Sequence, residues 1–208
     1  MDVSRGKSEE TRRRILAAAG QLFAEKGYAA VTMREIAKAA GCSHTAIYLY
    51  FKDKEALLHQ LALPPLRHVA ERLRDMLGDG RLTPERRLRD MCRTFVELSF
   101  QYRSLYAILF LAGADRVDDP EPKNDVHRQR NEVFALLRRG LTDCLPPLRD
   151  EAQGLAYGRM LFFLLHGIVA TYVHGEEPTE RVLERLRPTF DAAVEALLAG
   201  IRQRESAP

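Results

Sequence analysis

Hydrophobic side chains recur at helical spacing along almost the whole chain. Between residues 9 and 26, apolar side chains from Ile15 to Phe23 fall at i, i+3, i+4, i+7 and i+8, and charged residues occupy the opposite face. Gly27 follows this segment, and glycine commonly ends a helix by adopting a left-handed conformation. No segment keeps the period of two that a half-buried strand requires, so the pattern predicts an all-α fold.

Capping signals divide the rest of the chain into further helices. Thr32 and Glu35 have the spacing of a capping box, and Ser43 is a good N-cap for the next helix. Together with the apolar periodicity, these signals predict helices over about 33–40, 44–50, 54–77, 84–100, 104–112, 126–144, 149–174 and 178–201. The segment 113–125 is acidic and rich in turn-forming residues, so it is expected to be a loop.

Two adjacent prolines, Pro64 and Pro65, lie inside the fourth predicted helix. Proline removes a backbone donor and disfavours helix at the preceding residue, so the helix is expected to break or kink near Leu63. The chain is thus expected to have a small N-terminal unit, residues 1–56, and a larger C-terminal unit, residues 57–208, with the break in the helix that joins them. Because this helix alone is expected to join the two units, coupling between them should run through it.

The distribution of charge singles out the N-terminal unit. The chain of 208 residues carries a net charge of +3, and its first sixty residues contain ten Lys and Arg against seven Asp and Glu. The whole excess of positive charge therefore lies in the first sixty residues, and the remainder is balanced. A small excess of this kind becomes informative only if a nucleic-acid-binding motif lies in the same segment.

Cysteine usage and the distribution of apolar runs indicate an intracellular protein. The three cysteines are an odd number at wide spacing, which is typical of reduced thiols in a reducing compartment. The N-terminus lacks the apolar core of a secretory signal. The longest apolar run, Met160–Val173, is shorter than the ~20 residues that a membrane-spanning helix needs. We therefore expect a cytoplasmic protein with no membrane partner.

The segment Thr32–Lys54, TMREIAKAAGCSHTAIYLYFKDK, has the organisation of a helix-turn-helix. In such motifs the N-terminal residues of the second helix face base edges in the major groove, and neighbouring donors contact phosphates. The predicted DNA-binding residues are Thr32, Met33, Ser43, His44, Thr45, Tyr48, Tyr50 and Lys54. Similar helix pairs occur in bundles that bind no DNA. The local positive charge and the crowding of aromatic rings on a short helix favour the DNA-binding interpretation.

The run TRRRILAAAGQLFAEKGYAAVTMREIAKAAGCSHTAIYLYFKDKEALL, from Thr11 to Leu58, resembles the DNA-binding domain of TetR-family transcriptional regulators. The resemblance implies an all-α homodimer with an N-terminal three-helix DNA-binding domain and a C-terminal helical ligand-binding and dimerisation domain. It also implies a small-molecule effector that releases the dimer from a palindromic operator in double-stranded DNA.

The same resemblance assigns roles to individual residues. It implies phosphate contacts for Thr32, Tyr48 and Lys54, and base contacts for His44 and Thr45. Ile47 and Phe51 match core positions of the family. Leu49 departs from the pattern, because the family often has an aromatic or polar residue there, so the resemblance does not imply a base contact at this position.

The C-terminal unit resembles one subgroup of the same family. In the segment Phe162–Gly175, His166 and Gly167 match a Trp-His-Gly element, with Leu165 at the tryptophan position. The segment Ser104–Phe110 is similar to a Leu-Tyr element of that subgroup, without the proline that usually precedes it.

Large apolar side chains with a few polar tips form the candidate effector site, as is usual for small-molecule pockets. The set is Tyr102, Tyr106, Phe110, Phe134, Arg138, Tyr157, Leu161, Leu164 and His166. The alternative is that most of these residues form the domain core, and that His166 is a satisfied core or interface histidine. No acidic cluster accompanies the set, so an apolar effector that is neutral or anionic is expected, with Arg138 as the partner of an anion.

The last two helices are the candidate dimer interface. The run Met160–Val173 is apolar nearly all round, which predicts that its helix is covered on both sides. One side faces the core of the subunit and the other a partner, unless the helix is simply buried in a monomer. The predicted interface residues are Leu165, Val169, Ala193 and Leu197.

The sequence offers no support for an enzyme. It has no glycine-rich phosphate loop, no Gly-x-Ser-x-Gly elbow and no His or Cys pairs at metal-ligand spacing, so no cofactor and no metal are expected. The sequence therefore predicts a ligand-responsive DNA-binding transcriptional regulator acting as a repressor. Two alternatives remain. One is an activator with the same fold, and the other is a helical small-molecule-binding or interaction protein that does not bind an operator.

Overall fold

The computed structural model describes residues 3–106 and 116–206, and every regular element in those ranges is a helix. The N-terminal unit contains α1 (Val3–Lys26), α2 (Met33–Ala39) and α3 (His44–Ile47), and α4 (Lys54–Gly78) runs from it into the larger unit. The larger unit also contains α5 (Pro84–Gln101), α6 (Arg103–Tyr106), α7 (Asp125–Thr142), α8 (Glu151–Tyr172) and α9 (Thr179–Ser206). The all-α prediction is confirmed.

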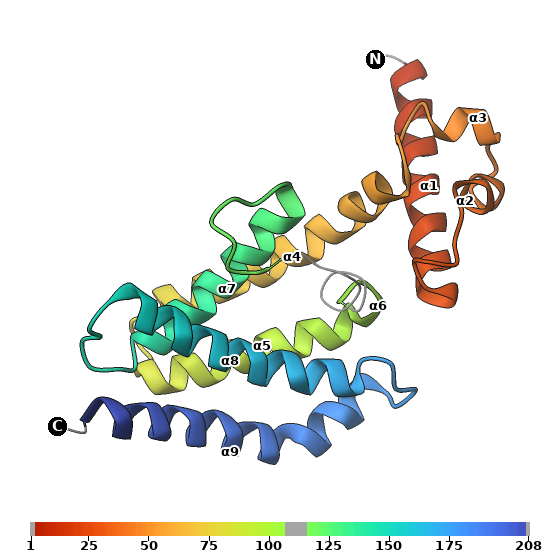
Figure 1. The fold of residues 1–208 in the computed structure, drawn as a ribbon. Coiled ribbons are helices and arrows are strands. Elements are labelled where there is room, and N and C mark those ends of the chain that lie inside the picture. The colour runs from red at the N-terminus through yellow and green to blue at the C-terminus, as the bar shows by residue number, and fades with distance from the viewer. Residues whose placement is uncertain (1–2, 107–115, 207–208) are drawn as a thin grey trace.

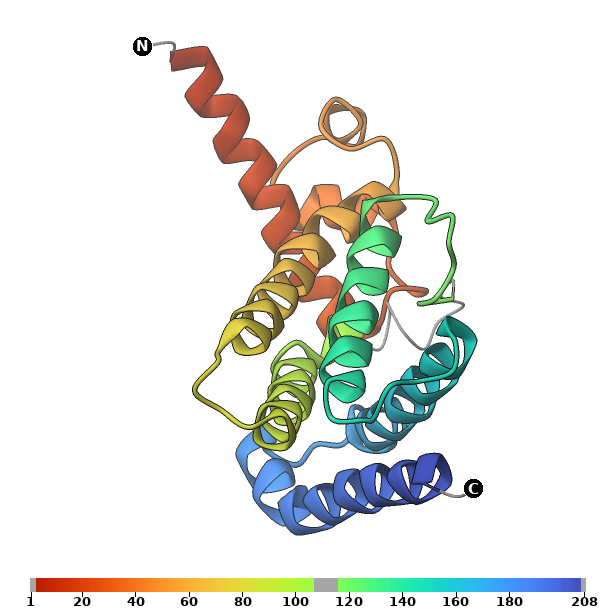
Figure 2. The same ribbon diagram turned by 90° about the vertical axis from the view of Figure 1, so that its left-hand side faces the viewer.

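The N-terminal unit has its own hydrophobic core. Ile15, Ala19 and Phe23 of α1 are buried in it, as the i, i+4, i+8 spacing predicts, together with Ile36 of α2 and Ile47 of α3. The N-terminal half of α1 extends beyond this core and projects away from the unit, as Figure 2 shows. The three helices therefore pack around one small core, and α3 lies on the side away from the C-terminal unit (Figure 1).

The fourth helix does not end at Pro64 and Pro65. The structure has one helix, α4, from Lys54 to Gly78, with both prolines inside it, so the expected break of the helix is not found. Two proline residues cost two backbone hydrogen bonds. Both flanks of α4 compensate by packing: its first turns enter the N-terminal core through Leu57, and its later turns enter the C-terminal core through Leu73.

The C-terminal unit is a helical bundle. The helix α7 packs along α4 and α8, while α5 and α8 both contact α9, which covers one side of the bundle (Figure 1). Its core is built from apolar faces of α4, α5, α7, α8 and α9. The expected loop agrees with the structure from residue 116 to Asn124, which caps α7, and residues 107–115 lie outside the described part of the chain.

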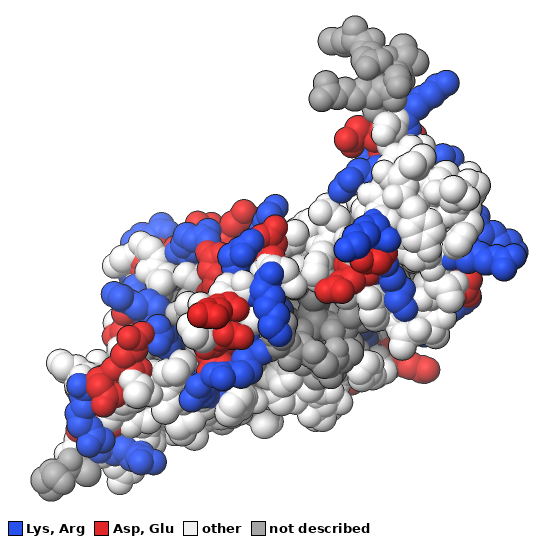
Figure 3. All heavy atoms as spheres, turned by 45° about the horizontal axis from the view of Figure 1, so that its top comes forward, with Lys and Arg blue, Asp and Glu red and all other residues white. Residues whose placement is uncertain are grey.

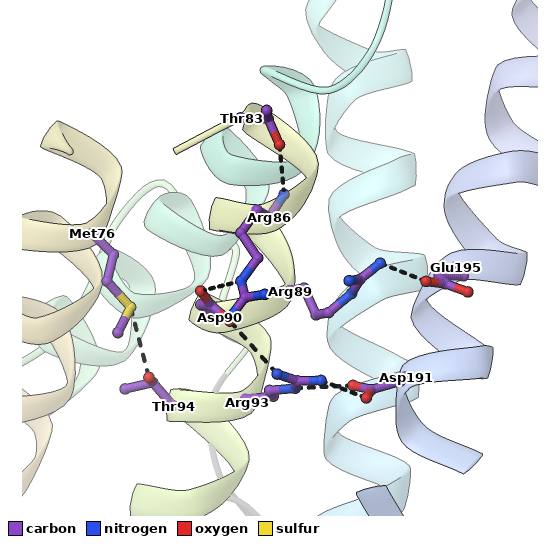
Figure 4. Close-up of polar contacts among 9 residues, drawn as sticks. All are labelled: Met76, Thr83, Arg86, Arg89, Asp90, Arg93, Thr94, Asp191 and Glu195. Carbon is purple, nitrogen blue, oxygen red and sulfur yellow. Dashed lines mark hydrogen bonds and ion pairs between the residues drawn. The ribbon is translucent and has the colours of Figure 1, made fainter. Parts of the chain in front are cut away.

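Arginines of α5 hold α9 in place. Figure 4 shows Arg93 donating to Asp191, with 3.0 Å between Nε and Oδ1, and Arg89 donating to Glu195 at 2.5 Å. These ion pairs are partly exposed, so each contributes at most ~1 kcal/mol, and their main effect is to fix which face of α9 meets α5. Elsewhere on this unit, basic and acidic side chains are interspersed over the surface (Figure 3), in agreement with its balanced charge.

The three cysteines differ in exposure. Cys92 and Cys144 are buried in the C-terminal unit, and Cys42 is half-buried in the turn between α2 and α3. Burial raises the pKa of the Cys144 thiol to about 11. All three are free thiols, as the odd number and wide spacing predict.

Candidate nucleic-acid interface and effector site

Local hydrogen bonds build the helix-turn-helix. Thr32 and Glu35 form a complete capping box at the start of α2, as predicted. The turn after α2 places Gly41 at a φ of 66°, in the left-handed region that glycine adopts without strain. Ser43 then caps α3, with its Oγ accepting a hydrogen bond from the Ala46 amide at 3.1 Å. The relative placement of α2 and α3 is therefore specified by a few local residues.

The short helix α3 turns its first residues to solvent. Ile47 is fully buried and anchors the helix, whereas His44 and Thr45 are exposed. Tyr48 is 47% exposed and meets the His44 ring edge to face, with 5.3 Å between ring centroids. The structure thus brings His44, Thr45 and Tyr48 together on one outward face. Leu49 follows them and is 84% exposed.

The other predicted DNA-binding residues differ in exposure. Met33 and Tyr50 are half-buried and pack against the N-terminal core, while Thr32 is exposed at the start of α2. The hydroxyl of Thr32 donates to Glu35 at 2.9 Å. Hydrogen bonds from Lys26 and from Thr32 lower the pKa of Glu35 to about 2, so a carboxylate stands beside this helix start.

Lys54 has a different environment from the one predicted. Its ammonium donates to the backbone carbonyls of Tyr28 at 2.7 Å, Val31 at 2.8 Å and Ala29 at 3.4 Å. It also lies 4.4 Å from the centroid of the Tyr28 ring. An ammonium has three donors, and here all three are directed at the chain itself. This geometry does not support the expected phosphate contact and indicates that Lys54 holds the α1–α2 loop against α4.

A hollow in the C-terminal unit brings together part of the predicted effector set. Tyr102 and Tyr106 line it, with apolar side chains of α4, α5, α6 and α7, among them Leu66, Val69, Phe95, Leu105 and Val133. Sequence analysis missed these five residues, because pattern alone does not distinguish a pocket wall from a core position. The hollow lies beside Pro65 of α4.

An aromatic cluster borders this hollow. The Tyr106 hydroxyl and His166 Nδ1 share a hydrogen bond of 2.7 Å, and the His166 ring stacks on Phe162. Phe134 meets Phe162 edge to face, and Leu161 is fully buried nearby in sequence. Burial, together with the positive charge of Arg130, lowers the pKa of His166, and burial raises the pKa of Tyr106. His166 is thus a satisfied histidine behind the pocket wall.

Arg138 and Tyr157 lie elsewhere. Arg138 pairs with Glu151 at 3.6 Å and crosses Gly158, whereas Tyr157 donates to Glu205 near the end of α9. These contacts do not support the prediction that Arg138 and Tyr157 share a pocket with Tyr106. The reason is that α7 and α8 are long, and these two residues are found away from the turns that border the hollow. Leu164 is half-buried against the core, and Phe110 lies outside the described residues.

Comparison with known proteins assigns the family. A family model described as bacterial regulatory proteins of the tetR family matches residues 15–61, and one described as a tetracyclin repressor-like C-terminal domain matches residues 88–197. The chain belongs to the TetR family. The helix-turn-helix and the C-terminal bundle described above correspond to these two matches, and the family consists of regulatory proteins.

Individual relatives agree with this assignment. The uncharacterised HTH-type transcriptional regulator YerO of Bacillus subtilis is 53% identical over 192 residues, and the match covers 85% of this chain and 63% of YerO. The chain therefore spans less than two thirds of that relative. The repressor Rv1474c of Mycobacterium tuberculosis is 29% identical over 187 residues, covering 85% of this chain and 89% of the repressor.

Solved structures confirm the TetR fold. The regulator PfmR from Thermus thermophilus superposes with a TM-score of 0.65 at 21% identity, covering 90% of this chain and 95% of PfmR. FadR from Bacillus subtilis, solved in complex with stearoyl-CoA, gives a TM-score of 0.65 at 23% identity, covering 90% and 98% of the two chains. The resemblance to a Trp-His-Gly subgroup stays a prediction.

The structure does not support Leu165 and Val169 of α8 as dimer-interface residues. Leu165 and Val169 are completely buried in the core of a single chain, so they cannot reach a partner. The outward face carries Phe163, which is 65% exposed, and Met160, which is 41% exposed. Ala193 and Leu197 of α9 are half-buried. A helix that is apolar all round gives no sequence signal for which face is outermost.

The two units are connected by α6 as well as by α4. Besides α4, the short helix α6 contacts α1, and Leu105 of α6 packs against the N-terminal core while lining the hollow. Arg103, two residues earlier, donates to Gly175 O at 2.8 Å and to the Thr179 hydroxyl at 2.5 Å, and so ties α6 to the start of α9. The expectation that the fourth helix alone joins the units is therefore wrong.

Other classes of site find no support in the described residues. In residues 3–106 and 116–206, no group of three or more His, Cys, Asp or Glu side chains is arranged to hold a metal. One helix, α8, is long and apolar enough to cross a membrane by length and composition. In this structure α8 packs in the bundle between α7 and α9.

Proposed function

We propose that this TetR-family protein binds a palindromic operator as a homodimer and is released by a small apolar molecule. The observation that carries the proposal is the outward face of α3. His44, Thr45 and Tyr48 are exposed together on a capped helix whose opposite side is anchored by Ile47. That face carries the polar side chains that a helix in the major groove uses, and the proposal assigns Tyr48 a phosphate contact.

The separate cores support the proposed division of labour. Residues 1–56 supply most of the first core and the DNA-reading face, and residues 57–208 supply the second core, the hollow and the helices α8 and α9. The exposed Phe163 and Met160 on α8 support dimerisation, because an isologous contact would bury them and would set two α3 helices at a fixed spacing. Operator binding requires access to chromosomal DNA, so the proposal places the protein in the cytoplasm.

The hollow supports an apolar effector. Among the lining residues that the structure describes, all but Ser99 and the hydroxyls of Tyr102 and Tyr106 are aliphatic or aromatic, and none is charged. The proposed effector is therefore neutral and apolar along most of its length. Its binding would move α6, because Tyr102, Leu105 and Tyr106 form one wall, and Leu105 would carry that movement to the N-terminal unit.

Binding to DNA tests the proposal directly. Fragments from upstream of the protein's own gene are titrated with protein at several salt concentrations, because phosphate contacts make affinity fall as salt rises. Tyr48→Phe should weaken binding to all operator variants alike. His44→Ala should relax the preference at one base-pair step by about 1–3 kcal/mol. The absence of salt-dependent binding to any fragment would favour the alternative, a helical small-molecule-binding or interaction protein.

The position of the operator separates a repressor from an activator. A repressor is expected to bind over the promoter, and effector addition should then release it. By reciprocity, operator DNA must weaken effector binding by the factor by which the effector weakens DNA binding. Calorimetry with and without operator measures that factor, and equal affinities would exclude an inducer.

A further inference from the structure

One apolar side chain on the DNA-facing unit is left in water. Leu49 is 84% exposed, more than Phe163 at 65% or Met160 at 41%, which lie on the proposed dimer face. A single exposed leucine is common on protein surfaces. This one is unusual in its surroundings, because it directly follows the face formed by His44, Thr45 and Tyr48.

The backbone holds Leu49 outward. Its amide donates to Ala46 O at 3.1 Å, and the Phe51 amide donates to Ile47 O at 3.0 Å. Ile47 is completely buried and Phe51 is 3% exposed, so the residues two positions before and after Leu49 are fixed in the core. Leu49 therefore stands on a rigid turn that directs its side chain away from the protein.

The spacing places Leu49 beside Thr45. The two residues are four positions apart, about one turn, as are His44 and Tyr48, whose rings touch. The outward surface of α3 and of the turn that follows it thus consists of two neighbouring rows. One row, His44 and Tyr48, carries hydrogen-bonding groups, and the other, Thr45 and Leu49, presents methyl groups.

The charge around these rows fits a polyanion. From Ile36 to Lys52 the sequence contains two lysines and no acidic residue, and both Lys38 and Lys52 are exposed. Duplex DNA combines negative phosphates with one apolar group in its major groove, the 5-methyl group of thymine. Leucine has no donor for a phosphate and no acceptor for a base amine, so the methyl group is the part of DNA that it can recognise.

We propose that Leu49 contacts the 5-methyl group of a thymine in each operator half-site and so determines specificity at that base pair. The proposal rests on the proposed function, because it requires α3 to lie in the major groove. It adds Leu49 to the predicted base contacts of His44 and Thr45.

Replacing thymine by deoxyuridine tests the proposal, since the two bases differ only by the methyl group. An operator fragment that the protein binds is synthesised with each symmetry-related thymine pair replaced in turn. For the unmodified protein, one replaced pair should lower affinity about fourfold per half-site, the value expected for loss of one buried methyl-sized group. Leu49→Ala should bind the thymine and deoxyuridine forms of that pair equally well, and Leu49→Met, which keeps an apolar side chain, should retain the discrimination.

The outcomes separate this proposal from the proposed function. If Leu49→Ala binds DNA and remains sensitive to the same deoxyuridine pair, another side chain contacts that methyl group and the proposal is overturned, while operator binding stands. If Leu49→Ala lowers the affinity for all operator variants by the same factor, the proposal is overturned as well, because such a loss indicates a contact with the DNA backbone and not with a base. If the unmodified protein binds no fragment in a salt-dependent way, both the proposed function and this proposal are refuted.

If Leu49→Ala does not bind DNA at all, the test uses the unmodified protein and Leu49→Met. The proposal is then refuted if replacing thymine by deoxyuridine changes their affinity at no thymine pair.

Discussion

At the scale of single residues, Lys54 shows how a side chain at a functional position serves the structure. Its three donors are satisfied by carbonyls of the loop between α1 and α2, which lies more than twenty positions earlier in the chain. The loop in turn precedes the capping box of α2. Lys54 therefore helps to orient the helix-turn-helix by fixing the loop from which α2 begins.

Replacing Lys54 should reduce stability more than replacing a neighbouring lysine. In Lys54→Gln the loop carbonyls lose a charged donor, which should lower the free energy of unfolding by about 1–3 kcal/mol. Lys52→Gln, at an exposed position, should change it by less than about 0.5 kcal/mol. Urea denaturation followed by circular dichroism measures both, and equal effects would contradict the assigned role of Lys54.

His166 should make stability depend on pH. Burial and Arg130 lower its pKa below the ordinary value of 6.5, so the unfolded chain binds its proton more readily than the folded chain does. The stability that the neutral ring provides is present above pH 6.5. It is lost progressively as the pH falls below 6.5 toward the lowered pKa.

The measurement is the thermal midpoint between pH 8 and pH 5 for the natural protein and for His166→Asn. The variant should show a shallower decline over this interval, because it has no ring to protonate. Parallel curves for the two proteins would indicate that other groups cause the decline.

At the scale of helices, the contact between α7 and α8 depends on a missing side chain. A Cβ atom at Gly158 would lie 2.8 Å from Cγ of Arg138, closer than such atoms approach in proteins. At Gly20 in α1, by contrast, the nearest atom would be at an ordinary 3.6 Å, on Leu61. The two glycines lie inside helices but differ in the space around them.

Alanine substitutions at these two positions should change the free energy of unfolding in opposite directions. Gly20→Ala should raise the free energy of unfolding by up to about 1 kcal/mol, because alanine favours helix over glycine. Gly158→Ala should lower it by about 1–3 kcal/mol, because Arg138 must move and α7 with it. Denaturant midpoints test the pair, and stabilisation by both substitutions would show that Arg138 moves aside at little cost.

The helices themselves were largely predictable from sequence, but how they pack against one another was not. Start signals such as Thr32 and Ser43 act within one turn, so a local pattern locates them. The continuity of α4 through Pro64 and Pro65 depends instead on the two hydrophobic cores against which its ends pack. Local sequence patterns do not contain this information. In α8, apolar residues surround the helix, so periodicity could not tell the buried Leu165 from the exposed Phe163.

The candidate site follows the same division. The face formed by His44, Thr45 and Tyr48 was predictable, because helix-turn-helix geometry is local. The separation of Tyr106 and Tyr157 at different ends of the bundle was not predictable, because it depends on the angles and positions at which the long helices pack against one another. Only tertiary contacts reveal Lys54 turned inward and Leu105 shared between the two units.

At the scale of the whole molecule, the exposed face of α8 determines the expected assembly. Phe163→Glu should give a chain that stays folded, because the side chain is 65% exposed, but that no longer dimerises. Light scattering after gel filtration should report about twice 23.6 kDa for the natural protein and a single-chain mass for the variant. Ala135→Glu, at an exposed position of α7, should remain a dimer. A single-chain mass for the natural protein at micromolar concentration would refute the assembly.

The unequal burial of the three thiols has a practical consequence. Cys92 and Cys144 are shielded in the C-terminal bundle, and Cys42 is the most accessible of the three. A maleimide dye added to the natural protein should therefore react first at Cys42, in the turn between α2 and α3, without any engineered cysteine. Its emission would then report directly when the helix-turn-helix meets a nucleic acid or leaves it.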